Sequence, residues 1–376
     1  MKDAQIAIIS PAADYHAAAV AWGLKKLSLQ ATVISSAELM TRNLSVKIGS
    51  DGAPVFHMRE GDLTYDIPSL TGFWFRRTAY TPTISSLMHP ADIKVAENDW
   101  EAHYRSLMFM ISSSGHYCLN PPLSKYFENM KPYQLQLAKS VGLKIPLTYI
   151  GNDFLQMREV FSKHEKVAFK TLTSNSWEPN YQQGQPSKAA FTQLLDKNSA
   201  LWEQFHFCPA IVQEYVEKAY EVRITVIGTD LIAVGINSQA YDFAKIDWRE
   251  KRIYKHKEAF FYIQDIPIIV RDGLMKYCAA MGLDYCAFDF VVTPENEWVF
   301  LEGNNSGQFL WCEAMVPETI LLEKFCKYLA FKSGHIPTSA TFTIADFDQD
   351  PAGAEALSRL KAALRSLDSS DANHNR

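Results

Sequence analysis

The stretch Cys286–Glu313 contains the densest group of residues that could carry chemistry. Two apolar runs in it, Ala287–Val292 and Trp298–Leu301, are separated by Thr-Pro-Glu-Asn-Glu. Apolar runs rich in Val, Phe and Trp around a Pro/Asn turn predict a β-hairpin.

Two acidic residues interrupt this predicted hairpin. If Thr293 and Trp298 close the turn, Asp289 stands directly opposite Glu302 and both side chains point to one face. Asn304 follows on the same side if the chain stays extended. Two facing carboxylates repel each other unless a positive charge lies between them. Carboxylates and an amide oxygen are hard ligands that suit Mg²⁺ holding substrate phosphates.

The alternative for this hairpin is that its acids simply lie on a solvated edge. The glycines and asparagines of Gly303–Gly307 favour the metal site, because they let the backbone approach a ligand closely.

Several basic residues lie at the ends of apolar strands or inside them. Lys170 ends the apolar run that starts at Val167, and a charge that emerges from a buried strand is unusual. Arg223 lies within an apolar strand and faces inward if its neighbours face outward, so a buried acid or phosphate is expected nearby. Arg76 and Arg77 end another strand. They are either an anion clamp for a substrate carboxylate or phosphate, or a solvated strand end that pairs with nearby acids.

The order of these motifs resembles a known family. Asp289, then Phe-Leu-Glu302-x-Asn304, resembles the metal-binding end of ATP-grasp ligases. Ser-Gly-Gln-Phe-Leu-Trp at 306–311 and Asp-Trp-Arg at 247–249 are similar to the branch of microviridin-type peptide macrocyclases, the graspetide synthetases.

This resemblance implies a role for each matching residue. It implies that ATP and Mg²⁺ are the cofactors, with Arg223 and Arg249 stabilising the reacting phosphates. The implied nucleotide-binding residues are Lys131, Lys170, Gln213, Glu214, Tyr215, Val216 and Glu221, and the implied metal ligands are Asp289, Glu302 and Asn304. Within the nucleotide set, the backbone of Tyr215 and Val216 would meet the adenine edge, Glu214 would lie beside the adenine amine and Glu221 would bind the ribose.

Three functions are compatible with these residues. The first, which we favour, is an ATP-dependent carboxylate–amine or carboxylate–alcohol ligase. It activates a side-chain carboxylate of a ribosomally made precursor peptide as an acyl-phosphate and forms intramolecular ester or amide links. The second is an ATP-grasp ligase that joins an amino acid or small molecule to a peptide, protein or metabolite. The third is a non-catalytic protein that binds nucleotide as a scaffold.

The elements that must position these residues predict an α/β (α+β) fold. Strands at Gln5–Ile9 and Ala31–Ser35 flank an Ala-rich helix, and this β-α-β opening predicts a small Rossmann-like parallel sheet. The resemblance implies an ATP-grasp fold after it. We expect an N-terminal domain at 1–125, ATP-grasp subdomains at 126–215 and 216–333, and a partly disordered extension at 334–376.

Further helices and strands follow from the local patterns. The polar stretch from Thr171 to Gln185 predicts a loop, and an Ala/Leu-rich helix is expected at Ala354–Leu367. Helices are also predicted at Ala91–Ser112, Glu128–Gly142, Pro267–Met281 and Ile320–Phe331, with strands or hairpins at Val55–Met58 and Leu63–Tyr65, Phe73–Arg77, Tyr117–Leu119, Leu147–Ile150, Cys208–Val216, and Val222–Ile227 with a partner from Leu231.

The composition excludes other classes of function. A formal net charge of -5 argues against a general grip on nucleic acid, and the absence of a long apolar run argues against a membrane span. Six cysteines without a CxxC pair favour a reduced, cytoplasmic protein. The resemblance implies a precursor peptide as partner and leaves room for a homodimer.

Overall fold

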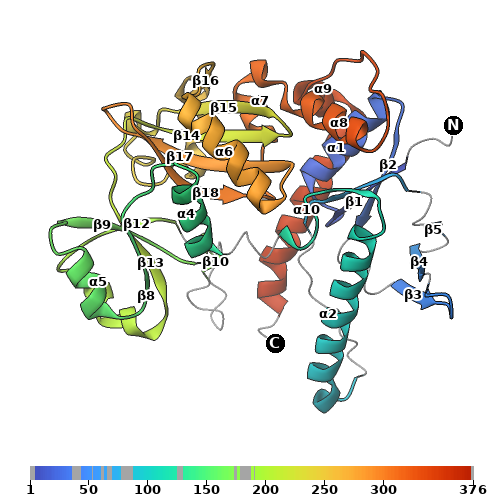
Figure 1. The fold of residues 1–376 in the computed structure, drawn as a ribbon, viewed down its shortest axis with the longest axis horizontal. Helices are drawn as coiled ribbons and strands as arrows, with labels where there is room; N and C mark the ends of the chain where they lie inside the picture. The colour runs from blue at the N-terminus through green and yellow to red at the C-terminus, as the bar shows by residue number, and fades with distance from the viewer. Residues whose placement is uncertain are drawn as a thin grey trace. The chain divides into compact units, whose positions relative to one another are not determined.

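The computed structural model describes residues 5–35, 44–52, 54–60, 63–65, 70–77, 88–124, 130–172, 176–177, 188–189 and 191–373, the last ten as backbone only. The chain forms two compact units (Figure 1). One contains Met1–Lys125 and Ile320–Ala363, and the other contains Tyr126–Thr319 and Leu364–Arg376. The finer division into four segments expected from the sequence stays a prediction.

The N-terminal unit is built on a parallel sheet of four strands in the order β2-β1-β6-β7. The predicted β-α-β opening is confirmed, because β1 pairs in parallel with β2 after the intervening helix α1. Asp14 caps α1 by accepting from the Ala17 backbone N–H at 2.9 Å. The strands and helix are β1 (Gln5–Ser10), α1 (Tyr15–Lys26), β2 (Gln30–Ser35), β6 (Gly72–Phe75) and β7 (Tyr117–Leu119).

Helix α2 (Pro90–Ser112) contributes buried apolar side chains to the core of this sheet. A separate antiparallel sheet contains β3 (Leu44–Ile48), β4 (Pro54–Glu60) and β5 (Leu63–Tyr65). The hairpin of β4 and β5 is the predicted one, and β3 was not predicted.

The C-terminal segment returns to the N-terminal unit. Helix α8 (Leu321–Lys332) contacts α1, and the short helix α9 (Ile344–Gln349) follows with a capping box at its start. Trp22 of α1 meets Phe342 and Phe347, with ring centroids 5.7 and 5.5 Å apart. Part of the expected extension is therefore a packed cover for α1. Helix α10 (Pro351–Asn373) runs beyond the expected end of its helix at Leu367.

The second unit contains two antiparallel sheets. The first has the strand order β12-β9-β13-β8, and its core lies under α5 (Phe154–Val160) and the 3-10 helix η3 (Ala200–Phe207). Its strands are β8 (Thr148–Gly151), β9 (Lys166–Lys170), β12 (Gln193–Asp196) and β13 (Ala210–Glu214). Most of the polar stretch predicted as a loop after Lys170 lies outside the described residues. Within it, the short strand β10 (Ser176–Trp177) pairs with β11 (Lys188–Ala189), which follows the stretch.

The second sheet of this unit has the order β16-β15-β14-β17-β18, and α6 covers one of its faces (Figure 1). Because strand side chains alternate between faces, Phe288, Phe290 and Val292 pack under α6, while Asp289 and Val291 line a cavity on the other face. The elements are β14 (Tyr220–Ile227), β15 (Asp230–Ile236), β16 (Phe260–Ile263), α6 (Ile268–Met281), β17 (Tyr285–Val292) and β18 (Trp298–Asn304).

Two helices and several short turns complete this unit. Helix α6 ends at Gly282, whose left-handed φ of 62° matches the predicted helix stop. Helix α4 begins at Lys131 and contacts β18 and α6. The bounds are α4 (Lys131–Ser140), α7 (Leu310–Met315), η4 (Ser238–Ala240), η5 (Lys251–Lys255), η6 (Lys257–Ala259) and η7 (Pro317–Thr319).

A β-bulge sets the register of the β17–β18 hairpin. The expected pair of Asp289 and Glu302 is confirmed, but the expected turn closure is wrong, since Val292 rather than Thr293 pairs with Trp298. The register shifts by one residue at Leu301. As a result Phe300 stays in the core while Leu301 and Glu302 both reach the cavity.

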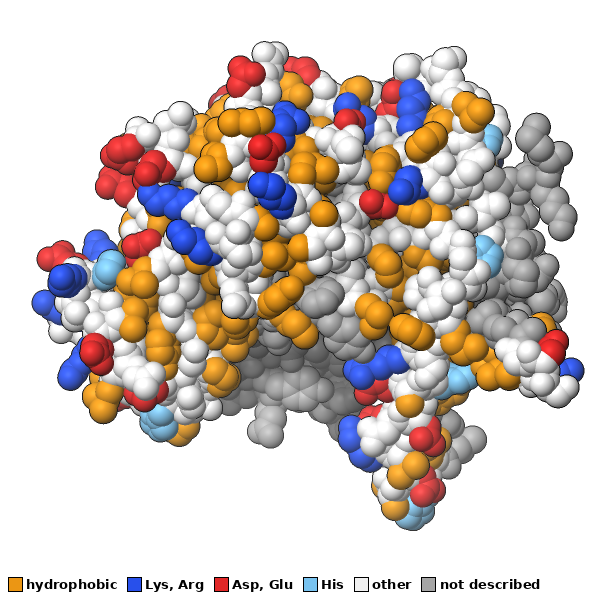
Figure 2. Space-filling model, in the orientation of Figure 1, with side chains coloured by type: hydrophobic (Ala, Val, Ile, Leu, Met, Phe, Trp, Pro, Cys, Tyr) orange, Lys and Arg blue, Asp and Glu red, His pale blue; other side chains and the backbone are white. Residues whose placement is uncertain are grey.

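The face shown in Figure 2 carries acidic and basic side chains interspersed with one another. It shows no uniformly basic surface of the kind that grips nucleic acid.

The aromatic cluster beneath the hairpin is expected to carry much of the stability of this unit. Phe300 is fully buried and its ring lies within 5.8 Å of Tyr277 and 5.6 Å of Phe290, centroid to centroid. Phe300→Ala should lower the free energy of unfolding by about 3–5 kcal/mol, because it removes a buried ring and leaves a cavity. Chemical denaturation of this unit measures the change. Phe207→Ala removes an exposed ring from the same unit and should change little; equal losses in both variants would contradict this packing.

Candidate functional site

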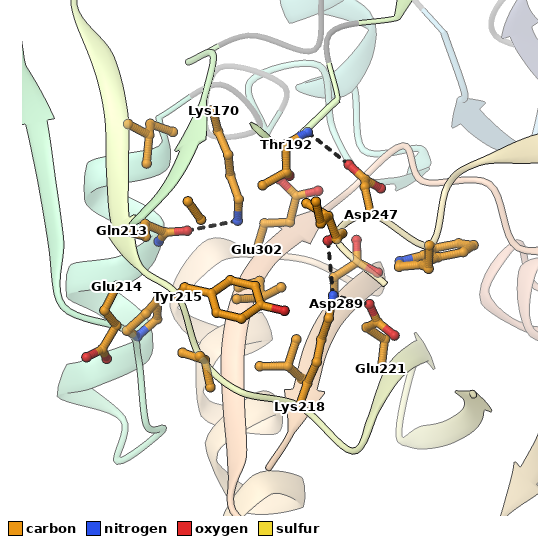
Figure 3. Close-up of a pocket in the computed structure, with 18 of the residues that line it drawn as sticks. Lys170, Thr192, Gln213, Glu214, Tyr215, Lys218, Glu221, Asp247, Asp289 and Glu302 are labelled. Atoms are coloured by element: carbon orange, nitrogen blue, oxygen red, sulfur yellow. Dashed lines mark hydrogen bonds and ion pairs between the residues drawn. The ribbon is translucent and has the colours of Figure 1, made fainter. Parts of the chain in front are cut away.

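A cavity in the second unit is lined by residues of both its sheets and of the segments between them (Figure 3). β9 and β13 contribute Lys170 and Gln213 from one sheet, and β17 and β18 contribute Asp289 and Glu302 from the other. The cavity therefore brings together residues that are more than 130 positions apart in the sequence.

Asp289, Glu302 and Asn304 converge as the hairpin pattern predicts. The Asn304 side-chain amide lies 3.1 Å from a Glu302 oxygen and 3.4 Å from an Asp289 oxygen. One amide group thus lies between two carboxylates, which relieves part of their repulsion. Burial raises the pKa of Asp289, and the neighbouring Glu302 charge adds to that rise.

The expected buried acid near Arg223 is Asp289. Arg223 Nε and Nη2 donate to the two Asp289 oxygens at 2.8 and 3.2 Å, and Nη1 donates to the Gln308 carbonyl at 3.1 Å. Both side chains are largely buried, so the pair is a bidentate ion pair out of water. The indole rings of Trp248 and Trp311 lie 5.7 and 5.6 Å from the guanidinium. The two tryptophans of the sequence motifs therefore meet at Arg223, and their ring centroids are 4.9 Å apart.

Glu302 has its own cation, supplied by helix α4. Lys131 is buried, and its Nζ donates to a Glu302 oxygen at 2.7 Å. Burial alone would raise the pKa of Glu302, but the Lys131 ammonium and the Asn304 amide hold that pKa well below its usual range. One helical turn later, the side-chain oxygen of Gln134 accepts from the Gly303 N–H at 3.1 Å. Helix α4 thus holds two consecutive residues of β18.

The glycines after Glu302 have a packing role that the sequence-based interpretation did not include. A Cβ at Gly303 would lie 2.8 Å from the ring of Phe288, on the face of the sheet away from the cavity. A Cβ at Gly307 would lie 2.6 Å from Cβ of Ala287. Both positions need glycine because β17 approaches them closely.

Lys170 enters the cavity from the end of β9. Its Nζ donates to the Gln213 side-chain oxygen at 2.8 Å (Figure 3). The Gln213 amide nitrogen in turn donates to Thr148 at 3.0 Å. Burial lowers the pKa of Lys170 to about 8, although the charge of Glu302 opposes this shift. The side-chain hydrogen bond of this ammonium thus goes to a neutral amide, and none of the described carboxylates is bonded to it.

The segment after β13 presents Tyr215 and Val216 to the cavity as expected, but the Glu214 carboxylate is held elsewhere. Its Oε1 accepts from the Leu147 N–H at 2.9 Å and its Oε2 lies 3.7 Å from His164. Glu214 still lines the cavity, and its expected place beside an adenine amine stays a prediction. Gln213 and Glu214 point to opposite faces because they are adjacent in a strand.

The Glu221 carboxylate, expected to accept from two ribose hydroxyls, is already occupied on both oxygens. Lys218 donates to one oxygen and Ser238 to the other, and Glu221 is almost fully buried. Burial raises the pKa of Glu221, and Lys218 opposes that rise. Glu221 and Lys218 both line the cavity, and Lys218 also donates to the Ile246 carbonyl at 3.0 Å.

Asp247 and Arg249 form a second bidentate pair at the cavity. Arg249 Nε and Nη2 donate to the two Asp247 oxygens at 2.9 and 2.6 Å. Burial by itself raises the pKa of Asp247, but the hydrogen bonds from Arg249 and from the Thr192 backbone lower it to about 2. Asp247 is thus an anion at neutral pH that holds Arg249 in one orientation.

Arg76 and Arg77 lie in the other unit, beside Asp14. Arg76 Nε is 3.7 Å and Arg77 Nε is 3.2 Å from the Asp14 carboxylate. Arg76 is fully buried and Arg77 about half-exposed, so the strand end is not simply solvated. Pairing with a nearby acid, one of the two interpretations of this motif, is what the structure shows.

Comparisons with known proteins identify the architecture. No model of a known protein family matches the sequence, and no curated protein matches it. A RiPP-associated ATP-grasp ligase from Chryseobacterium gregarium, solved with ADP and a leader and core peptide, aligns with a TM-score of 0.77 and 24% identity over 90% of this chain and 99% of its own. The chain has the ATP-grasp fold.

Two further solved structures agree with this assignment. Macrocyclase MdnC from Microcystis aeruginosa, bound with precursor peptide MdnA, aligns with a TM-score of 0.71 and 22% identity over 86% of this chain and 99% of its own. The ATP-grasp ligase PsnB, complexed with a precursor variant, Mg and ADP, aligns with a TM-score of 0.65 and 17% identity over 89% of this chain and all of its own. The fold class predicted from the sequence, an ATP-grasp fold with a Rossmann-like parallel sheet before it, is confirmed.

On this ATP-grasp fold, the hairpin donors fit a hard divalent cation. The Asn304 amide nitrogen lies within 3.4 Å of an oxygen of each carboxylate. Turned by 180°, the same amide would present its oxygen to this space, so the three residues together would offer oxygen ligands to a hard cation. Within the described part of the chain, no group of three or more His, Cys, Asp or Glu side chains is arranged to hold a metal by itself. A site of two acids and one amide is thus the arrangement that the structure offers.

Three residues of the site could not be recognised from the sequence as members of it. Lys218, Ser238 and Gln134 follow no strand alternation or motif that marks them, because their roles depend on contacts with distant segments. Their burial is the only signal, and burial of a polar residue is known only once the fold is known. The helices in the described part of the chain include none with the apolar length that a membrane crossing requires.

The buried pair of Arg223 and Asp289 leads to a test of stability. Asp289→Asn should lower the free energy of unfolding by about 3–5 kcal/mol, because it leaves a buried guanidinium without its counter-charge. The double variant, Asp289→Asn with Arg223→Met, should lose less free energy of unfolding than the two single variants lose together, and the difference should exceed about 1 kcal/mol. Chemical denaturation of the four proteins of this cycle measures the coupling.

The exposed pair of Lys245 and Asp242 is the matched control, and its cycle of Lys245→Met and Asp242→Asn should show no measurable coupling. Strictly additive losses for Arg223 and Asp289 would contradict the assignment of this pair as a buried, mutually dependent ion pair.

Proposed function

We propose that the chain is an ATP-dependent ligase that activates a side-chain carboxylate of a precursor peptide and joins it to a hydroxyl or amine of the same peptide. The observation that carries this proposal is the cavity itself, where two facing carboxylates are surrounded by four basic residues, three lining the cavity and Arg223 bound to Asp289 behind it. These are Lys131, Lys170, Arg223 and Arg249. Positioning and charge stabilisation are what phosphoryl transfer from ATP requires.

The nucleotide base fits the apolar end of the cavity. Apolar side chains of both sheets line it, among them Ala168 and Ile211 on one side and Val291 and Leu301 on the other. The backbone of Tyr215 and Val216 borders the same space, and backbone groups can recognise an adenine edge without a side chain. Since the Glu214 carboxylate is held by Leu147, adenine recognition rests on the backbone of this segment.

The phosphates fit the opposite, charged end. Asp289, Glu302 and Asn304 would hold Mg²⁺ there, and the ion supplies charge neutralisation between the terminal phosphates when it is bound. Lys170 and Lys131 lie within the same end and would bind phosphate oxygens. Gln213 orients the Lys170 ammonium, and it does so through a neutral hydrogen bond that leaves the positive charge available.

The chemistry takes two steps. A peptide carboxylate oxygen attacks the γ-phosphorus of ATP, the bond to the β-phosphate oxygen breaks, and an acyl-phosphate and ADP result. A hydroxyl or amine then attacks the acyl carbon, loses its proton and expels inorganic phosphate, which leaves an ester or amide. Arg249 and Lys170 would stabilise the negative charge that develops in both steps. The peptide loses the elements of one water for every link.

A peptide substrate is supported by the proteins with the same fold. The Chryseobacterium ligase was solved with a leader and core peptide, and MdnC with the precursor peptide MdnA. The motifs Asp-Trp-Arg at 247–249 and Ser-Gly-Gln-Phe-Leu-Trp at 306–311, which suggested the macrocyclase branch, meet in space through Trp248 and Trp311.

The decisive experiment co-expresses the chain with a peptide encoded beside it that is rich in Thr, Ser or Lys and in Asp or Glu. Mass spectrometry should show loss of one water per link formed. Glu302→Gln should reduce this loss on the order of 100-fold or more, because it removes a charged metal ligand. Because Glu302→Gln also removes the counter-charge of buried Lys131, chemical denaturation should first show that this variant is folded.

Glu297→Gln is the matched control, because Glu297 lies on the same hairpin in an exposed pair with Lys144. It should leave the water loss unchanged. A gain in peptide mass would instead favour a ligase that adds an amino acid or small molecule, and full activity in Glu302→Gln would refute the assigned metal site.

The low pKa of Lys170 predicts how nucleotide affinity depends on pH. The protonated ammonium binds phosphate, and the neutral amine formed above pH 8 does not. Affinity for ADP should therefore fall as the pH rises through 8, by up to about tenfold at pH 9. Calorimetric titration between pH 7 and 9.5 measures this. Lys170→Arg stays charged over the whole range and should show no such fall. The same pH dependence in both proteins would assign the titration to another group.

A further inference from the structure

The Asp247 carboxylate accepts hydrogen bonds on both of its oxygens. Its Oδ1 accepts from the Arg249 backbone N–H at 3.0 Å and from Arg249 Nε at 2.9 Å. Its Oδ2 accepts from Arg249 Nη2 at 2.6 Å and from the Thr192 backbone N–H at 3.1 Å. The carboxylate side chain is only 10% exposed. All four bonds together leave this carboxylate one orientation.

The partners of the Asp247 carboxylate belong to two different sheets of this unit. Thr192 directly precedes β12 of the four-stranded sheet, whereas Asp247 and Arg249 follow β15 of the five-stranded sheet (Figure 3). The ring of Phe191, next to Thr192, also lies 6.0 Å from the Arg249 guanidinium. The segment 191–192 of one sheet thus holds the Asp-Trp-Arg segment of the other.

The remaining surface of Arg249 is the part that a ligand can meet. Asp247 occupies Nε and one edge of the guanidinium, which leaves Nη1 for other partners. The Arg249 side chain is 43% exposed and lines the cavity together with Asp289 and Glu302. Besides Asp247, the carboxylates of Glu302 and Asp289 raise the pKa of Arg249. Besides burial, the Arg249 charge lowers the pKa of Lys170. A guanidinium in this position faces the charged end of the cavity.

We propose that Asp247 is a positioning residue that aims Arg249 at the terminal phosphate of the bound nucleotide. Asp247 touches neither the nucleotide nor the substrate itself, and it acts by fixing the plane of the guanidinium before the ligand arrives. This inference rests on the proposed nucleotide function of the cavity. Because a pre-oriented arginine needs no reorganisation when charge develops, its contribution appears selectively with ligands that carry the terminal phosphate.

The test compares the affinities of ADP and of the β,γ-imido analogue of ATP, measured by calorimetry with Mg²⁺ present. The dissociation constant of ADP divided by that of the analogue isolates the interactions with the terminal phosphate. In Asp247→Asn the ratio should fall on the order of tenfold while ADP binding stays unchanged, because an amide cannot accept both guanidinium bonds. Arg249→Ala should lower the ratio to a similar value. The double variant should fall no further, since both changes remove the same interaction.

Asp242→Asn is the matched control, because Asp242 is an exposed aspartate five residues earlier and pairs with Lys245. It should keep the ratio of the unaltered protein. Arg249→Lys provides a second variant, which keeps the charge but cannot form the two-bond fork with Asp247, and it should lose most of the ratio as well.

Two outcomes would overturn the inference alone. One is the original ratio in Asp247→Asn or in Arg249→Lys, and the other is a double variant whose loss equals the product of the two single losses. Failure of the unaltered protein to bind either nucleotide would overturn the proposed function together with this inference, so the two failures are distinguishable.

Discussion

The site depends on the placement of two carboxylates on adjacent strands. Asp289 and Glu302 are paired directly across the hairpin, where like charges destabilise a sheet. Each acid is balanced by a cation from a different element, Arg223 on β14 and Lys131 on α4. The charges therefore tie the hairpin to its neighbouring strand and to a helix that begins more than 150 residues earlier in the chain. The same two ion pairs therefore balance the acids and hold the hairpin against β14 and α4.

A bulge makes that placement compatible with a packed core. In a regular strand Phe300 and Glu302 would face the same side, so either the ring would leave the core or the acid would enter it. The extra residue at Leu301 re-phases the strand, and each side chain reaches its proper environment. Gly303 then faces Phe288 with no room for a side chain, and the Gln134 amide binds its N–H. The local irregularity is thus supported on both faces.

Much of the fold and part of the site could be predicted from the sequence, because both depend on local alternation. The facing pair of Asp289 and Glu302, the buried partner of Arg223 and the lysine at the end of β9 all follow from strand periodicity. The orientation of Glu214 and the closure of Glu221 by Lys218 depend on partners that no local pattern reveals. The expected roles of these two carboxylates toward adenine and ribose came from the resemblance, and the contacts of this chain place both carboxylates in internal bonds.

The charges around the cavity explain why metal and phosphate binding should depend on each other. Among the described residues of the cavity and its wall, four acids each hold one cation: Asp289 with Arg223, Glu302 with Lys131, Glu221 with Lys218 and Asp247 with Arg249. Lys170 is a fifth cation, and its side-chain hydrogen bond goes to the neutral amide of Gln213 instead of a carboxylate. A triphosphate needs several positive charges at once, and each cation that turns to it leaves a buried carboxylate uncompensated, at a cost of several kcal/mol. In the proposed function, a divalent cation between Asp289 and Glu302 would restore that compensation, so Arg223 and Lys131 would be free to meet the phosphates only when the metal enters with them.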